Sequence, residues 1–287
     1  MNKKINQHEL GQRVLIGAVI LALISVGAIA NDKYLLAIAL IVSSISIYEL
    51  NKALGKISRR SLIGLLQAFN IIFIVFAYMK ARNIDLILFR NITTSSITLT
   101  HLVIFYVLLI VIASFTVRKK LLRSITTVLS TTLLTVLGTI YITLPFAYLV
   151  AFTNVKHLVM IFITTTMTDS VAYLMGKMVG KTKVSVLKNI SPNKTLEGFL
   201  GGMLSSIITG FALYTAFNIK MGLGSFILFM MGLAILSQVG DLLASAIKRI
   251  IGIKDFSNIL GPHGGVLDRF DSILLLPQVV RYFMPHL

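Results

Sequence analysis

Long apolar runs recur along the whole of this sequence, and they limit what the chain can fold into. A hydrocarbon core roughly 30 Å thick is crossed by about 20 helical residues. With 56% apolar and 13% charged residues, a water-soluble fold would expose far too much apolar surface. We therefore predict an all-α polytopic membrane protein with about nine transmembrane helices, the fifth long enough to contain a break near Gly138. The predicted spans are residues 13–30, 34–50, 61–79, 100–117, 126–152, 157–176, 198–217, 222–247 and 271–285.

The basic residues are divided unequally between the loops that join these spans. If the N-terminus is inside, twenty of the 27 Lys and Arg residues lie on that side. Positive charge is retained on the cytoplasmic side of membranes, so we expect a cytoplasmic N-terminus, a C-terminus on the far side and a location in the cell membrane. The net charge of +17 is spread over short juxtamembrane loops. It therefore suits anionic lipid headgroups better than nucleic acid, and we predict no nucleic-acid partner.

The two halves of the chain differ in where their polar residues lie. Residues 1–155 read as apolar spans joined by short basic loops, whereas residues 156–287 carry acids, bases and glycines at the ends of their spans. We interpret the first region as transmembrane scaffold and the second as catalytic, within one membrane domain. The chain has no cysteine, so any metal must be bound by oxygen ligands or by histidine.

Two polar clusters border the predicted sixth and seventh spans. Asp169 lies near the end of one span, with Tyr173 one turn further along the same face. This pattern fits either a functional acid or an aspartate whose hydrogen bonds hold helices together. The second cluster, Ser191 to Gly198, places Lys194 and Glu197 at a helix start, where Asn193 or Thr195 can act as the cap. Taken alone, it is more typical of a capped helix with a lysine reaching toward the membrane surface than of an anion site.

The segment SAIKRIIGIKDFSNILGPHGGVLDRFD, residues 245–271, combines acids, bases and paired glycines in an otherwise apolar protein. Just before and within it, Asp241, Ser245 and Lys248 share one helical face at i, i+4 and i+7. In the loop that begins at Gly261, the backbone N–H groups of the glycines can approach phosphate oxygens closely. Asp268 and Asp271 follow at i and i+3. Carboxylates beside phosphate-binding groups suit Mg²⁺, and we predict a phosphate-handling active site.

The spacing of polar residues in this segment resembles the signature of the phosphatidate cytidylyltransferases, also called CDP-diacylglycerol synthases. The resemblance covers roughly residues 160–275. It also includes the pairs Asp169-Ser170, Lys194-Thr195 and Gly240-Asp241. Three positions depart from the usual family pattern: Val171 replaces a glycine, Leu196 a tryptophan and Ala244 a glutamate. The missing glutamate leaves fewer ligands for a second cation.

The resemblance implies an enzyme that joins CTP to phosphatidic acid, giving CDP-diacylglycerol and pyrophosphate, with its active site facing the cytoplasm. It implies Mg²⁺ as cofactor and leaves open a second cation and a homodimer. We predict Asp241 and Asp268 as the principal Mg²⁺ ligands, with Asp271, Asp169 and Glu197 as further metal-site residues. Together with Lys248, the first three of these acids form the predicted catalytic set. The predicted substrate-binding residues are Lys194, Ser191, Ser245, Arg249, His263, Gly264, Gly265, Arg269 and Tyr173.

Two alternative functions fit some of the same features. Another CTP-dependent lipid kinase, or a CDP-alcohol phosphotransferase, also needs acids, bases and Mg²⁺ at a membrane face. A transporter could line an ion or lipid path with Asp169 and Asp241. That interpretation expects two symmetric halves with broken helices, whereas here the polar residues are confined to one half.

Overall fold

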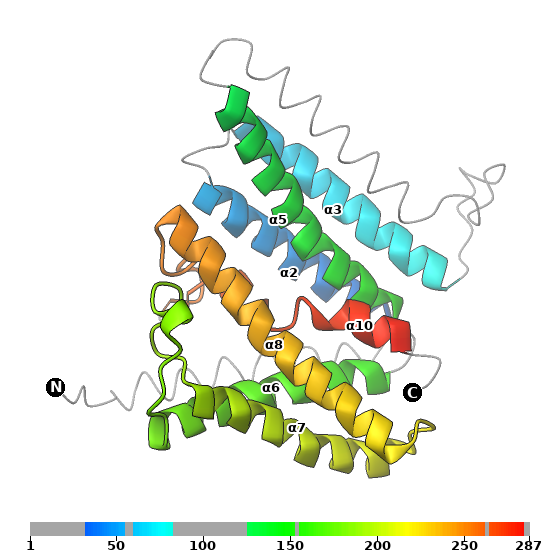
Figure 1. Cartoon of the computed structure of the whole chain (residues 1–287). Helices are drawn as coiled ribbons and strands as arrows, with labels where there is room; N and C mark the ends of the chain where they lie inside the picture. The colour runs from blue at the N-terminus through cyan, green and yellow to red at the C-terminus, as the bar shows by residue number, and fades with distance from the viewer. Residues whose placement is uncertain (1–31, 55–59, 83–124, 153–154, 262–263, 284–287) are drawn as a thin grey trace.

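The computed structural model describes residues 32–54, 60–82, 125–152, 155–261 and 264–283. Within these ranges the regular structure is helical apart from one isolated β-bridge between Lys183 and Thr195. Figure 1 shows two groups of long helices. One group contains α2 (Asp32–Ala53), α3 (Arg60–Ala81) and α5 (Ile125–Ala151), and the other contains α6 (Val155–Met178), α7 (Leu196–Phe217) and α8 (Leu223–Ile251).

These six helices coincide with six of the predicted spans. Five of them, α2, α3, α6, α7 and α8, have the length and composition to cross a membrane. The sixth, α5, has 27 residues, which at 1.5 Å per residue is also long enough. The predicted spans 13–30 and 100–117 lie outside the described residues. The fold is that of a polytopic, all-helical membrane protein.

The fifth predicted span is long enough to contain a break near Gly138, but α5 runs through this residue as a continuous α-helix. The glycine serves packing instead. A Cβ at this position would lie 2.5 Å from Cδ2 of Leu50, a buried side chain of α2. The missing side chain therefore lets α2 and α5 approach closely.

The apolar run 271–285 is not the ninth long helix that its hydropathy predicts. Residues 271–275 form turns, and the helix that follows, α10 (Leu276–Phe283), has only eight residues. Eight helical residues are too short to cross a bilayer. This segment is apolar because it is packed inside the protein: Leu276, Pro277 and Val280 are buried, and α10 contacts α5, α6 and α8.

The α6–α7 contact depends on glycines. Gly198, Gly201 and Gly202 are buried in α7, and a Cβ on Gly198 would lie 2.7 Å from the carbonyl oxygen of Ala172 in α6. Gly176 lies on the α6 side of the same contact. Small residues four apart are typical of helices that approach closely in membranes. This contact holds the end of α6 beside the beginning of α7, where the charged residues gather.

Candidate active site

Lys248 is the centre of a buried charge cluster at the C-terminal end of α8. Its ammonium nitrogen lies 2.7 Å from Asp268 Oδ1 and 3.7 Å from Asp271 Oδ2. Both acids come from the helical turn around α9 (Leu267–Phe270). The prediction that these two acids share a face is confirmed by this common partner. The Lys248 side chain is only 10% exposed and that of Asp268 only 3%, so water screens the ion pair weakly.

Asp268 also fastens the loop that precedes it. Its second carboxylate oxygen, Oδ2, accepts hydrogen bonds from the backbone N–H groups of Phe256 and Gly265, both at 2.9 Å. Together with Lys248, these donors engage both oxygens of the carboxylate. Asp268 therefore acts as a structural anchor for its own loop and as the counter-ion of a buried lysine.

The described N–H groups of the glycine-rich loop already donate hydrogen bonds to acceptors of the protein itself. They are therefore not free to bind a phosphate, which differs from the prediction. The Gly264 N–H donates to the carbonyl oxygen of Gly261 at 3.2 Å, and the Gly265 N–H donates to Asp268. Gly264 has φ +76°, and a Cβ there would lie 2.9 Å from Asp268 Oδ2. Glycine is required here because the chain takes a left-handed turn directly against a carboxylate.

Lys194 forms a second ion pair, at the entrance to α7. Its ammonium nitrogen lies 2.7 Å from Asp241 Oδ2 and also donates to the carbonyl oxygen of Gln238 at 3.3 Å. The next residue, Thr195, caps α7 by accepting a hydrogen bond from the Gly198 N–H, as one of the two predicted caps. The Lys194 side chain is 28% exposed and that of Asp241 is 34% exposed, so this pair is accessible where the Lys248 pair is not.

Asp169 and Asp271 bring two more carboxyl groups to the same region. Asp169, on α6, is exposed, hydrogen-bonds to the Ser272 side chain, and has Asp241 and Lys194 as electrostatic neighbours. Asp271 is buried. Burial, followed by the nearby Asp241 carboxylate, raises the pKa of Asp271 to about 8, against the lowering effect of Lys248. Below that pH, Asp271 holds a proton unless another positive charge enters the cluster.

The charge balance of this cluster fits a divalent cation. When all are ionised, Asp169, Asp241, Asp268 and Asp271 exceed Lys194 and Lys248 by two negative charges. In the described part of the chain, no three His, Asp or Glu side chains are close enough to form a metal site by themselves. Mg²⁺ does not require such a cage, because it commonly uses one or two carboxylates together with substrate phosphates and water.

The Tyr141 hydroxyl approaches the same cluster from the other helix group. It comes from α5, is buried, and has no hydrogen-bond partner among the described residues. Its electrostatic neighbours are Asp271 and Asp241. A buried hydroxyl without a partner is costly, so its position beside two acids suits a water molecule or a phosphate oxygen. A tyrosine within an apolar span carries no distinctive pattern, so nothing in the sequence marks this residue as part of a site.

Four of the other predicted site residues lie around the cluster without joining its ion pairs. The Glu197 carboxylate accepts hydrogen bonds from the Thr182 N–H at 3.0 and 3.2 Å, which ties it to the loop before α7. Arg249 is exposed and donates to the carbonyl oxygens of Ile190 and Ile253. Arg269 is exposed on α9. Tyr173 is 63% exposed, with the Lys177 ammonium 6.0 Å from the centre of its ring.

The last three predicted positions are placed as follows. Ser245 is half-buried on α8 between Asp241 and Lys248, on the helical face that the spacing predicts. Ser191 is half-buried in the turn before α7, where its carbonyl oxygen accepts from the Lys194 N–H at 3.3 Å. His263 lies outside the described residues.

Glu49 is a second residue of this region that lies in the stretch interpreted as scaffold from the sequence. It belongs to α2 and is fully buried. Its carboxylate accepts hydrogen bonds from Ser257 Oγ at 2.5 Å and from the N–H groups of Val266 and Leu267 at 2.9 and 2.8 Å. The available signal was an acid at membrane depth, which is expensive unless it is paired. The pattern alone did not reveal its partner, which is more than 200 residues away in the chain.

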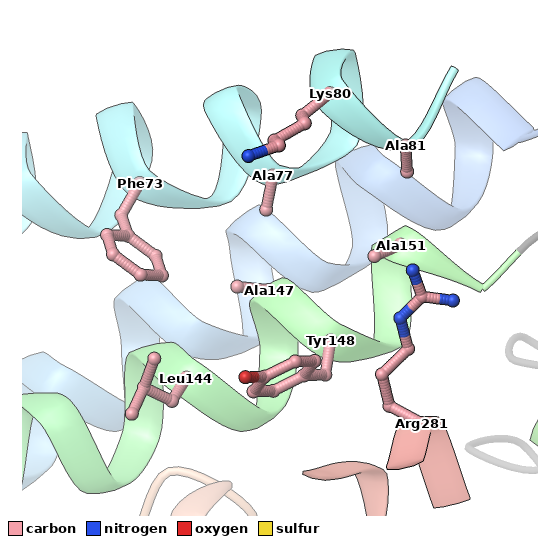
Figure 2. Close-up of a pocket in the computed structure, with 9 residues that line it drawn as sticks. All are labelled: Phe73, Ala77, Lys80, Ala81, Leu144, Ala147, Tyr148, Ala151 and Arg281. Carbon is pink, nitrogen blue, oxygen red and sulfur yellow. The ribbon is translucent and has the colours of Figure 1, made fainter. Parts of the chain in front are cut away.

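A cavity of about 270 Å³ lies apart from the acidic cluster, between the C-terminal ends of α3 and α5 and the helix α10. Figure 2 shows Phe73, Ala77, Ala147 and Ala151 along it, with the basic side chains of Lys80 and Arg281. Its lining contains no carboxylate. The cluster around Lys248 and Asp241 is therefore the better candidate for a cation-dependent site.

Comparisons with known proteins identify the family of the chain. The chain is 36% identical over 131 residues to the phosphatidate cytidylyltransferase of Staphylococcus epidermidis strain RP62A, and 37% identical over 131 residues to that of Staphylococcus aureus strain COL. Each alignment covers 46% of this chain and 50% of the relative, so the chain spans about half the length of these relatives. The family model described as the cytidylyltransferase family matches residues 11–287. The chain therefore belongs to the cytidylyltransferase family.

Proposed function

We propose that this protein is a phosphatidate cytidylyltransferase, which transfers CMP from CTP to phosphatidic acid and releases pyrophosphate. The observation that carries the proposal is the pair of carboxylate–ammonium contacts, Asp241 with Lys194 and Asp268 with Lys248, gathered at one end of the α7–α8 pair. A membrane helix end suits a reaction between a lipid and a soluble nucleotide. The names of the staphylococcal relatives support the same activity.

The reaction forms one bond and breaks one. An oxygen of the lipid phosphate attacks the α-phosphorus of CTP, and the bond from that phosphorus to the bridging oxygen of the β-phosphate breaks as pyrophosphate leaves. The attacking phosphate is already an anion at neutral pH, so no protein nucleophile is required. The task of the protein is to hold two polyanions in line and to balance their charge.

Different residues suit different parts of that task. Lys194 is partly exposed, so its ammonium can exchange Asp241 for a phosphate oxygen with little rearrangement. Arg249 and Arg269 are exposed cations beside the same helix ends. Lys248 is buried between two acids, which suits a fixed positive charge near the reacting groups better than a mobile one. The Tyr141 hydroxyl can donate a hydrogen bond to a phosphate oxygen or to water.

We further propose Mg²⁺ as cofactor, with Asp241 as its main protein ligand and Asp169 or Asp271 beside it. Asp241 and Asp169 are accessible. Asp268 is less suitable than the sequence pattern suggested, because both of its oxygens already accept hydrogen bonds. When bound, Mg²⁺ would neutralise charge that develops on the pyrophosphate leaving group.

The test of the activity is product analysis with purified protein in detergent. We expect release of pyrophosphate from CTP that requires both phosphatidic acid and Mg²⁺, with CDP-diacylglycerol as the lipid product. A CTP-dependent lipid kinase would release CDP in place of pyrophosphate. A CDP-alcohol phosphotransferase would consume the CDP-lipid and release CMP. Either result would reject the proposal, and because the assay uses detergent, turnover would also distinguish an enzyme from a transporter.

The proposed site faces the cytoplasm, because the loops rich in lysine and arginine lie at its end of the helices. The absence of cysteine from the chain allows a direct test. Ser185, in the short helix η3 (Ser185–Leu187), and Lys220, in the turn between α7 and α8, are exposed at opposite ends of α7. In sealed cells an impermeant maleimide should label Lys220→Cys and not Ser185→Cys. The reverse result would invert the proposed orientation.

A further inference from the structure

Glu49 connects the two helix groups at the candidate site. It is a residue of α2, and its three hydrogen-bond partners, Ser257, Val266 and Leu267, all lie between α8 and α9 or at the beginning of α9. The side chain is fully buried. A buried carboxylate is strongly disfavoured unless donors surround it. These contacts therefore hold the loop and the carboxylate together.

Two of the hydrogen bonds that Glu49 accepts come from N–H groups at the start of a helix. The first N–H groups of a helix have no partner within it and must find acceptors elsewhere. Val266 precedes α9 and Leu267 begins it, and Glu49 supplies one carboxylate oxygen to each. The fit is close, because a Cβ on Gly265 would lie 2.6 Å from Glu49 Oε2. Gly265 is therefore needed to let the carboxylate reach the backbone.

The position of α9 decides where Asp268 lies, and Asp268 holds the Lys248 ammonium at 2.7 Å. We propose that Glu49 is a positioning residue for the reaction, which fixes the start of α9 so that Asp268 and Lys248 keep their place at the site. The proposal rests on the proposed function. It assigns a role in the reaction to a helix of the front region.

The other buried polar side chains of that region provide a matched comparison. Asn70, on α3, is fully buried, donates to Ser43 Oγ at 2.8 Å and accepts from Thr143 Oγ1 at 3.0 Å. All three of these residues lie within α2, α3 and α5. Asn70 therefore links helices of the front group, and Glu49 links that group to the catalytic loop.

The test compares Glu49→Gln with Asn70→Ala. The amide of glutamine keeps the size of the side chain but turns an N–H₂ group toward donors, so α9 should lose an anchor. We expect kcat of Glu49→Gln to fall about 10- to 100-fold, with KM for CTP changed less than about threefold. We expect Asn70→Ala to keep the wild-type kcat. If Glu49→Gln loses only melting temperature or yield, with normal kcat for the folded protein, the positioning role is rejected.

Two measurements separate this proposal from the activity itself. Hydrogen exchange at the amides of residues 265–267 should accelerate in Glu49→Gln and stay slow in Asn70→Ala, whether or not the protein transfers CMP. In the wild-type background, Gly265→Ala should accelerate amide exchange in the loop, because the added methyl group would clash with the Glu49 carboxylate. In a Glu49→Ala background, where that carboxylate is gone, the same substitution should accelerate exchange little further. The anchoring role of Glu49 would be rejected if amide exchange were unchanged in Glu49→Gln. It would also be rejected if Gly265→Ala and Glu49→Ala lowered the protection of the loop in a fully additive way. Failure of the wild type to make CDP-diacylglycerol would reject the proposed function alone.

Discussion

The front helices α2, α3 and α5 and the back helices α6, α7 and α8 differ in how much hydrogen bonds and glycines contribute to their contacts, although Gly138 also lies at the α2–α5 contact. In the front group, uncharged side chains bond across the helix contacts: Asn70 to Ser43 and Thr143, and Gln67 Nε2 to the carbonyl oxygen of Ser44 at 2.8 Å. In the back group, glycines let α6 and α7 approach closely. Close backbone packing brings several helix ends together, and in this protein those ends carry the acids and bases.

This difference separates the roles of the two helix groups only in part, because both groups contribute residues to the candidate site. The charged pairs at the candidate site come from the back group and from α9. The front group contributes Glu49 and Tyr141 to the same place. The front helices are therefore more than a scaffold, and substitutions in each group can separate their contributions to stability and activity.

The largest effects are expected from the two acids of the back region, and they should differ in kind. Asp268→Asn leaves the buried Lys248 without a full counter-charge, which typically costs about 3–5 kcal/mol of stability. We expect both the melting temperature and kcat to fall strongly, with no recovery at high Mg²⁺. Asp241→Asn should lose about 100-fold or more in activity and recover part of it as Mg²⁺ is raised. The measurement is kcat against Mg²⁺ concentration for each variant.

The opposite pattern would change the assignment of the cation. If Asp268→Asn shifts the Mg²⁺ requirement and Asp241→Asn does not, the ion is bound at Asp268 and the Lys248 pair must open when it binds. Near-normal turnover of both variants would remove the acidic cluster from the reaction.

A smaller effect, on activity and stability together, is expected from the α6–α7 contact. A methyl group at Gly198 would lie 2.7 Å from the Ala172 carbonyl oxygen, which is a backbone atom that cannot rotate away. Overpacking of this kind costs about 1–3 kcal/mol. Because the contact adjoins Thr195 and Lys194, we expect Gly198→Ala to lower the melting temperature and to reduce kcat/KM about tenfold. Loss of stability with normal kcat/KM would show that the contact does not position the site.

Asn70→Ala, in the front group, is expected to lower stability without changing activity, unlike Gly198→Ala. It removes two buried hydrogen bonds and leaves the Thr143 hydroxyl without its acceptor, whereas the Ser43 hydroxyl keeps its bond to the Leu40 carbonyl oxygen. The cost is about 1–3 kcal/mol. We expect a lower melting temperature in detergent and an unchanged kcat. The proposed difference between the two groups would be rejected if Asn70→Ala reduced kcat as much as Gly198→Ala does.

The sequence pattern predicted much of the fold because hydropathy reports burial in lipid or in protein. The spans that correspond to α2, α3, α5, α6, α7 and α8 are confirmed. Hydropathy does not distinguish a span from an apolar segment packed among helices, and for this reason residues 271–285 were assigned a long helix that the structure replaces with turns and α10. The predicted total of nine spans is therefore wrong at its last member. The first and fourth spans lie outside the described residues and stay predictions, as does the homodimer.

For the site, spacing along one helix was informative and contacts between distant segments were not. The shared face of Asp241, Ser245 and Lys248 follows from helical geometry, as does the Asp268–Asp271 pair. Nothing in the pattern says that Asp268 and Glu49 would use the N–H groups of the glycine-rich loop. That loop was therefore interpreted as a phosphate cradle, although in the structure its glycines make room for carboxylates of the protein itself.

The smallest effect is expected at Glu197, an acid predicted to belong to the metal site. Its carboxylate accepts hydrogen bonds from the Thr182 N–H, and among the described residues it forms no ion pair with Lys194 or Lys248. In Glu197→Gln the side-chain carbonyl oxygen can still accept from Thr182. We therefore expect kcat within about threefold of the wild type and the same dependence on Mg²⁺, measured beside Asp241→Asn in one titration. An increased Mg²⁺ requirement in Glu197→Gln would extend the cation site to the start of α7, and the charged cluster would then be larger than the four aspartates and two lysines described above.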